Sequence, residues 1–347
     1  MRRYVWLTLL VVGVVACNHD NEVNRNDIVT DASDPSLINA WGLAFNPMGV
    51  AWVSANGTGV SEVYDSNGNH VIPPITIPPP AALIPAGPQA PSTPTGQVFN
   101  GDVSSFAGDA FIFVTEDGTI SGWQPALGST AALRVDNSAS TAVYKGVTIG
   151  TASSGENLLY AANFHNGTVD VYDASYAPVA VAGGFIDPQL PAGFAPFNVA
   201  AVNGDILVSY ALQDEDMEDD VAGAGNGFID LYDGDGNLLG RLLSGNELNS
   251  PWGMTISPFS FGAAPNNLIV GNFGDGRIHI YNFDFNGTPQ AVLAGELEDN
   301  NQTPITIDGL WALQFGPGTG GFASDTLYFT AGPNDETGGI FGSLTSR

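Results

Sequence analysis

The stretch His165-Asn166-Gly167-Thr168-Val169 decides the fold, because related stretches occur six times along the chain. Each is a polar turn that leads into a strand with an early Ile or Val, and several of these strands end in Tyr-Asp. The Ile or Val anchors are spaced 60, 49, 60, 49 and 62 residues apart, at Val60, Ile120, Val169, Ile229, Ile278 and Ile340. Repeats of roughly 40 to 60 residues with three or four short strands are typical of β-propeller blades.

Two other features recur with the anchor. Glycine stands two residues before it in five of the six copies, where a tight hairpin needs a residue that adopts positive φ. Trp41, Trp252 and Trp311 occupy one position of the inner strands, so we expect these rings to pack between the blade sheets. The Pro-rich segment 73–94 is expected to be an extended surface loop that joins the first two blades.

The ends of the chain predict how the ring closes. The last repeat supplies strands near residues 311–315, 326–330 and 339–344, and then the sequence stops. Segment 26–31 precedes the first inner strand, and pairing it with the last blade would remove an exposed sheet edge. The sequence therefore predicts an all-β, six-bladed β-propeller, with the N-terminal strand closing the last blade, as a single domain over residues 28–347.

Composition limits the possible partners. The chain of 347 residues has 8 Lys and Arg against 36 Asp and Glu, and its formal net charge is -28. Such a charge disfavours nucleic acid and anionic membrane surfaces, so no nucleic-acid partner is expected. The content of 44% hydrophobic residues is too high for a disordered chain. We expect a monomeric globular protein.

The N-terminus has the pattern of a bacterial lipoprotein signal peptide at residues 1–16. A charged start and an apolar run of about a dozen residues, too short to span a membrane, end in a small residue before Cys17. Lipid on Cys17 would be the membrane attachment, residues 17–27 a tether, and Asn18 favours the outer membrane. An ordinary secretory leader, with a periplasmic or secreted product, is the alternative.

The repeats also carry a family resemblance. The chain resembles an uncharacterised family of secreted bacterial propellers, similar to NHL-repeat proteins, from about Ile28 to Leu344. The resemblance implies export and the propeller fold, and no reaction. The phrases that carry it are Asn39-Ala40-Trp41-Gly42-Leu43, residues 115–123, residues 161–172, Asp220-Val221-Ala222-Gly223-Ala224-Gly225, residues 271–278 and residues 330–336.

The repeat alignment places a polar set at one mouth of the channel, where propellers usually bind ligands. Residues four and six positions before the anchors, with their neighbours, form this set. They are Asn56, Glu116, Asn163, His165, Asn272, Asp275, Asn334, Asp335 and Glu336. Asn and Asp are also what hairpin turns require, whereas Glu116 and His165 are not favoured turn residues and are the candidates for catalysis.

An acidic loop in the fourth repeat has six carboxylates within seven residues, at 214–220. Dense like charge resists folding unless a cation neutralises it, so Asp214, Asp216, Asp219 and Asp220 are candidate Ca²⁺ ligands over the mouth. A solvated acidic loop is the alternative. The segment 233–237 resembles part of a calcium loop but is expected to be a hairpin turn. The four histidines are scattered, which argues against a transition-metal site.

Three functions remain open. The first is a binding module for an extracellular or periplasmic carbohydrate or protein ligand, assisted by calcium. The second is a metal-dependent hydrolase or lactonase that uses Glu116 and His165. The third is a structural surface protein, which would hold if Phe164, Phe197 and Phe273 plugged the channel mouth.

Overall fold

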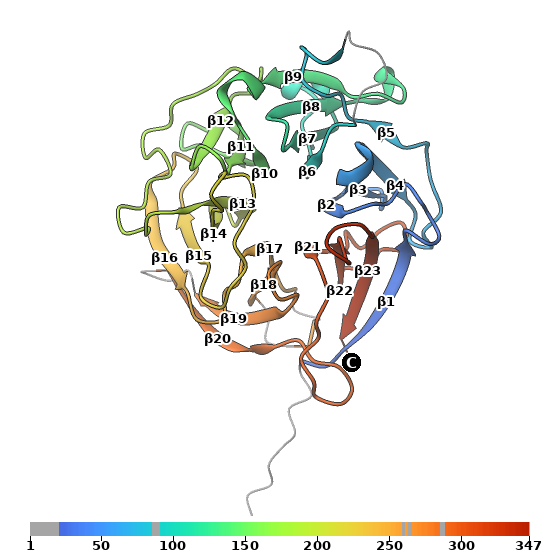
Figure 1. The fold of residues 1–347 in the computed structure, drawn as a ribbon, viewed down its shortest axis with the longest axis vertical. Helices are drawn as coiled ribbons and strands as arrows, with labels where there is room; N and C mark the ends of the chain where they lie inside the picture. Colours follow the sequence, from blue (N-terminus) through green and yellow to red (C-terminus); the bar gives the residue numbers. More distant parts are fainter. Residues whose placement is uncertain (1–20, 85–90, 259–260, 263–265, 285–288, 347) are drawn as a thin grey trace, which may run out of the picture.

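The computed structural model describes residues 21–84, 91–258, 261–262, 266–284 and 289–346. Its strands form six antiparallel sheets arranged as blades around a central axis (Figure 1). The predicted all-β, six-bladed propeller is therefore confirmed. In the described part of the chain, no helix is long and apolar enough to cross a membrane.

The blades follow one another in chain order, each from its innermost strand outward. The first contains β2 (Ala40–Phe45), β3 (Ala51–Ala55), β4 (Val60–Tyr64) and β5 (Ile75–Thr76). The second contains β6 (Pro94–Phe99), β7 (Phe111–Thr115), β8 (Thr119–Trp123) and β9 (Ala132–Asp136). The third contains β10 (Tyr144–Thr151), β11 (Asn157–Asn163) and β12 (Thr168–Tyr172).

The second half of the ring has the same plan. The fourth blade contains β13 (Phe194–Val202), β14 (Asp205–Leu212), β15 (Phe228–Tyr232) and β16 (Leu238–Ser244). The fifth contains β17 (Pro251–Ile256), β18 (Leu268–Asn272), β19 (Ile278–Asp284) and β20 (Gln290–Glu296). The sixth contains β21 (Leu310–Phe315), β22 (Thr326–Ala331), β23 (Ile340–Ser346) and β1 (Val23–Thr30).

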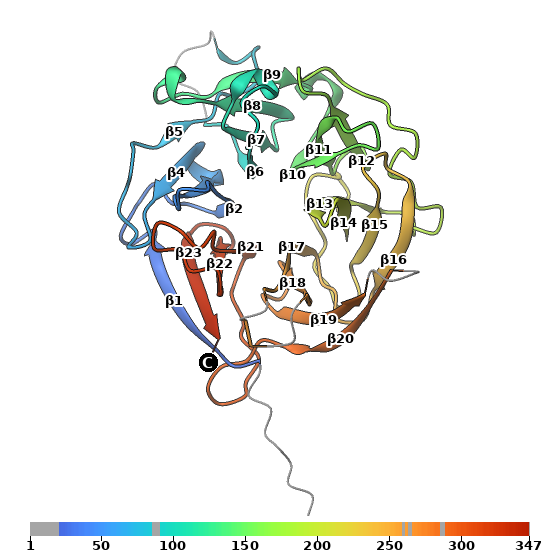
Figure 2. The ribbon, with the colours of Figure 1, turned by 180° about the vertical axis from the view of Figure 1, so that it is seen from behind.

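The ring closes as the sequence predicts. Strand β1 pairs antiparallel with β23, from Val23 opposite Ser346 to Thr30 opposite Ile340, and the two ribbons lie side by side in both views (Figures 1 and 2). The strand begins at Val23, so residues 23–27 are part of the blade, which corrects the predicted tether of 17–27. The predicted signal peptide and Cys17 lie outside the described residues.

Turn chemistry explains the repeated Tyr-Asp. The tyrosine is buried at the end of the third strand, as Tyr64 is in the first blade. The carboxylate of Asp65 then accepts backbone N–H groups of Asn67 and Asn69 at 2.8 and 2.9 Å, which closes the next turn. Asp233 makes the same contacts, so 233–237 is the hairpin turn that the sequence predicts.

Two expectations about local structure need correction. The Pro-rich segment does not run entirely over the surface, because its start forms β5, where Ile75 is buried against the first blade. Glycine before the anchor takes positive φ at Gly118, Gly167 and Gly276, but not at the other two copies. Those two repeats carry the left-handed conformation elsewhere in the same loop.

Candidate functional site

Aromatic rings fill the channel below one mouth. Trp41 stacks on Trp311 with ring centroids 3.5 Å apart, and Phe273 stacks on the same indole at 3.8 Å. Phe164 and Phe197 are fully buried beside them. The tryptophans are core residues as predicted, but they pack on one another near the axis rather than between blade sheets. These rings form an aromatic plug, the arrangement that the structural alternative requires.

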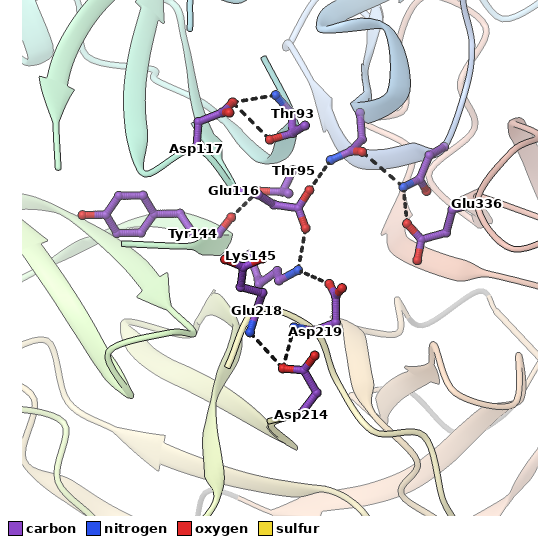
Figure 3. Close-up of polar contacts among 12 residues, drawn as sticks. Thr93, Thr95, Glu116, Asp117, Tyr144, Lys145, Asp214, Glu218, Asp219 and Glu336 are labelled. Carbon is purple, nitrogen blue, oxygen red and sulfur yellow. Dashed lines mark hydrogen bonds and ion pairs between the residues drawn. The ribbon is translucent and has the colours of Figure 1, made fainter. Parts of the chain in front are cut away.

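Lys145 lies directly on this plug. It is the only lysine in the sequence, and its side chain is 2% exposed. The ammonium group donates to Glu116 at 2.5 Å and to Asp219 at 3.1 Å (Figure 3). It also lies 5.2 Å from the ring centroid of Trp41, a cation–π contact. Burial lowers the pKa of Lys145, but the two carboxylates outweigh this effect and raise it, so the lysine is a permanent cation.

Asparagines extend the contacts from Lys145 across the first blade. Asn56 donates to the second carboxylate oxygen of Glu116 at 2.8 Å. Asn39, just before β2, donates to Glu336 at 2.6 Å and lies 3.4 Å from the amide oxygen of Asn56. The connected residues, called here the mouth network, are Asn39, Asn56, Glu116, Lys145, Asp219 and Glu336.

The mouth holds more negative charge than Lys145 compensates. Burial, with repulsion from Glu116, raises the pKa of Glu336 to about 7. Burial also raises the pKa of Asp220, and Asp219 beside it adds to the effect. One carboxylate oxygen of Asp220 is buried and accepts no hydrogen bond from the described residues. The mouth therefore has carboxylates that can bind a further cation or hold a proton.

Four of the nine residues in the predicted polar set serve local structure instead. Asn163 donates to Asp170 at 2.9 Å, within its own blade. The carboxylate of Asp275 accepts the backbone N–H of Arg277. Asn334 and Asp335 are exposed and have positive φ, which Asn and Asp tolerate. These residues have the structural role that was the alternative for them.

Two further members of the set each have one buried polar atom that forms no hydrogen bond in the described structure. The Asn272 amide donates to the Glu247 carbonyl at 2.7 Å, but its oxygen is buried and unbonded in the described structure. His165 is half-buried, and its Nδ1 likewise accepts or donates no hydrogen bond there. Neither residue contacts the mouth network in these interactions.

The acidic loop reaches the mouth at its end, through Asp219 and Asp220. Asp219 forms the ion pair with Lys145, although its side chain is 75% exposed. Asp214 accepts backbone N–H groups from Glu218 and Asp219, and Asp216 is exposed. Among the described residues, the four candidate Ca²⁺ ligands do not meet as a cluster of three or more carboxylates. The loop thus contacts the mouth through an ion pair with a lysine.

The sequence reasoning missed Lys145 and Asn39. Both belong to the starts of inner strands, whereas the candidate set came from the loops between second and third strands. The sequence did hold a signal for Lys145, because it is the only lysine in a chain with 36 acidic residues. Lysine is also rarely buried unless it is paired with a carboxylate.

A cavity of about 570 Å³ lies between the inner strands at the other end of the channel. Its walls are mostly backbone and aliphatic side chains such as Val147, Val199 and Leu313. Two of its polar side chains are already hydrogen-bonded, since Gln97 donates to the Trp52 carbonyl and Asn198 to that of Trp252. The cavity has room for a small ligand, and Asn203, Thr255 and Gln314 also line it.

The chain is similar to known proteins in sequence and in fold. No family model matches it. Uncharacterized protein L690 of Acanthamoeba polyphaga mimivirus is 30% identical over 342 residues, which cover 92% of this chain and 83% of that protein.

Solved structures agree on the architecture. A protein of unknown function from Bacteroides thetaiotaomicron has a TM-score of 0.57 at 8% identity, covering 94% of this chain and 74% of that one. Virginiamycin B lyase from Staphylococcus aureus has a TM-score of 0.53 at 9% identity, covering 93% and 99%. At such identities the likeness shows the fold alone. The chain is thus a six-bladed β-propeller, and it belongs to the same family as mimivirus protein L690.

Proposed function

We propose that this protein is an exported binding module that captures a positively charged protein segment on the mouth network. One observation carries the proposal: a fully buried cation is outnumbered by carboxylates at a mouth that is closed below by aromatic rings. The excess negative charge at Glu116, Asp219, Asp220 and Glu336 favours a cationic group, and the overall charge of -28 adds long-range attraction.

The shape of the mouth supports a protein ligand. Because the plug fills the channel, a ligand rests on the face of the propeller rather than entering the axis. The rings that would stack on a sugar are inaccessible, since Trp41 and Trp311 are each 1% exposed. A segment that carries Lys or Arg needs only surface carboxylates, so it suits this face better than the carbohydrate alternative.

A basic peptide tests the proposal directly. A four-residue arginine peptide with blocked ends is titrated into the mature protein while tryptophan fluorescence is recorded, because Trp41 lies beside Lys145. We expect saturable binding that weakens strongly between about 0.05 M and about 0.5 M NaCl. The corresponding glutamate peptide is expected not to bind.

Matched variants locate the site. Glu336→Gln and Glu116→Gln are each expected to weaken binding of the arginine peptide by about tenfold or more. Glu156→Gln is the control, because Glu156 is an exposed carboxylate in the turn between β10 and β11. Equal affinity of the three variants and the wild type would show that the peptide responds only to overall charge.

General acid–base catalysis is the second candidate, favoured by the pKa of about 7 at Glu336. Glu116 suits this role less than predicted, because Lys145 and Asn56 hold both of its oxygens as acceptors. A hydrolase or lactonase would then use Glu336, and Glu336→Gln would remove hydrolysis of a lactone or ester panel while the protein stays folded. The wild type is expected to be inactive on this panel if the protein only binds.

The cellular location is also part of the proposal. The N-terminal pattern supports a lipid on Cys17 and a place in the bacterial envelope, with the propeller facing extracellular or periplasmic ligands. Metabolic labelling with a palmitate analogue tests it. Cys17→Ser should remove both the label and the membrane association.

A further inference from the structure

A second group of ionisable residues lies where the ring closes. Asp34 is in the connection from β1 to β2, Glu62 is on β4, and His70 is in the turn after β4. Their ligand atoms all lie within 4.8 Å of one another. His70 Nε2 is 2.6 Å from Asp34 and 3.5 Å from Glu62. These three residues are called the seam cluster.

Hydrogen bonds hold the two carboxylates in place. Ser36 donates to Glu62, and its hydroxyl also lies 2.6 Å from Asp34. Tyr64 donates to the other oxygen of Asp34 at 2.6 Å. These contacts help to lower the pKa of Asp34 to about 2 although burial opposes them. The cluster is therefore pre-organised from two directions.

One ligand atom in the cluster is left without a hydrogen bond. Glu62 has 0% side-chain exposure, and its Oε2, the oxygen nearer His70, is buried and unbonded in the described structure. A buried carboxylate oxygen without a donor is costly unless a cation or a proton meets it. This orphaned atom points to something that the protein chain does not itself supply.

Two other fully buried carboxylates in the described part of the chain have an arginine partner. Asp109, also with 0% side-chain exposure, receives two hydrogen bonds from Arg134, at 2.7 and 2.6 Å. Asp230, likewise fully buried, receives one from Arg241 at 3.0 Å. The ion pairs of the seam cluster in the described structure involve His70 alone, which is charged only when protonated. A divalent cation would supply the missing charge.

We propose that the seam cluster binds a divalent transition-metal ion through Asp34, Glu62 and His70. Two carboxylates and one imidazole suit Zn²⁺ and its neighbours, whereas Ca²⁺ and Mg²⁺ prefer oxygen ligands only. Three protein ligands leave room for water at the remaining positions. This proposal departs from the expectation drawn from the scattered histidines, because the partners of His70 in the cluster are two carboxylates rather than other histidines.

The location gives the metal a structural effect. Asp34 follows the strand that closes the sixth blade, and Glu62 and His70 belong to the first blade. A shared ion would therefore link the loop that leaves the closing strand to the first blade. His70 is 39% exposed, so the ion can enter from solvent without unfolding.

Metal titration tests the site on the mature protein after treatment with EDTA and dialysis. We expect one Zn²⁺ per chain by calorimetry and a melting temperature that rises with Zn²⁺ concentration. Affinity is expected to follow Zn²⁺ over Co²⁺ over Mn²⁺, with Ca²⁺ and Mg²⁺ far weaker. Bound Co²⁺ should show visible absorption bands that differ from those of Co²⁺ in buffer alone. A chain that binds none of these ions, or that prefers Ca²⁺, overturns the proposal.

Variants separate the seam from the mouth. His70→Gln and Asp34→Asn are each expected to weaken Zn²⁺ binding by at least about tenfold. His165→Gln is the matched control, because it removes a histidine at the mouth and should leave the Zn²⁺ affinity unchanged. Both histidines are partly exposed, so the variants should fold, which circular dichroism checks. Loss of binding in His165→Gln alone would place the metal at the mouth and refute the seam site.

Discussion

The mouth network and the seam cluster both contain buried carboxylates, but they differ in the positive charge that balances them. At the mouth, a lysine with 2% exposure lies against the carboxylates of Glu116 and Asp219. At the seam, His70 is the only basic group among the described residues that forms an ion pair with Glu62 and Asp34. Burial makes charge expensive in both places, and only the mouth carries a permanent cation of its own.

The difference teaches where each region can accept a partner. At the mouth the lysine is satisfied, and the open positions are carboxylates near the surface. At the seam, the buried Oε2 of Glu62 is the oxygen without a hydrogen bond. The hydroxyls of Ser36 and Tyr64 already bond the other carboxylate oxygens of the cluster. A surface that is acidic and open suits a large cationic partner, whereas a small enclosed set of ligands suits a single ion.

The largest expected effect comes from removing the lysine. Lys145→Met keeps the aliphatic stem on the aromatic plug but leaves Glu116 without its cation. We expect the free energy of unfolding to fall by about 3 kcal/mol, measured by urea denaturation near pH 7. Arg277→Met is the control, because Arg277 is 47% exposed and its pair with Glu296 should contribute less than about 1 kcal/mol. Equal losses in both variants would contradict the buried role of Lys145.

The next effect depends on pH and concerns Glu336. Its pKa is raised from 4.5 to about 7 in the folded protein, so the folded state keeps a proton that the unfolded chain loses. The wild type should therefore lose stability as pH rises from about 4.5 to 7, by about 3 kcal/mol relative to Glu336→Gln, with no further change well above pH 7. Urea denaturation at several pH values measures this difference.

Carbon-13 NMR of the Glu336 carboxyl provides the direct check. A titration midpoint near 7 would agree with a carboxyl that is poised between ligand binding and proton transfer. A midpoint near 4.5 would remove the basis for the acid–base alternative and leave the binding proposal intact, since a fully ionised Glu336 attracts a cation more strongly.

The repeated pattern of turns and strands made the blades and the closing strand predictable from the sequence. The Gly turns and the Tyr-Asp ends act locally, so they are visible in the sequence, and the same register placed Glu116 and Glu336 at one mouth. The partners were not predictable in this way. Lys145 and Asn39 come from another part of the repeat, and Asp34 meets His70 only because the loop after β1 folds against the first blade. Contacts between residues at different positions of the repeat can be identified only in the folded structure.

The seam predicts a smaller effect whose sign depends on the metal. Burial, with repulsion from Asp34, raises the pKa of Glu62, so its charge costs stability at neutral pH when no cation is bound. In EDTA, Glu62→Gln is expected to be as stable as the wild type or more stable by about 1 kcal/mol. With excess Zn²⁺, the wild type should become the more stable protein. Thermal and urea denaturation with and without Zn²⁺ measure both signs. An unchanged order after Zn²⁺ addition would contradict a metal role for Glu62.

The smallest effect distinguishes the two carboxylates that hold Lys145. Asp219 is 75% exposed, whereas Glu116 is 23% exposed, so solvent already screens the contact of Asp219. Asp219→Asn is expected to lower the free energy of unfolding by less than about 0.5 kcal/mol and Glu116→Gln by clearly more, because Glu116 bears most of the compensation of the buried cation. Urea denaturation at low and high salt measures both, and the Asp219 effect should vanish at high salt. A large, salt-independent loss in Asp219→Asn would mean that the acidic loop is a fixed part of the mouth and that a basic ligand must bind beside it rather than replace its contact.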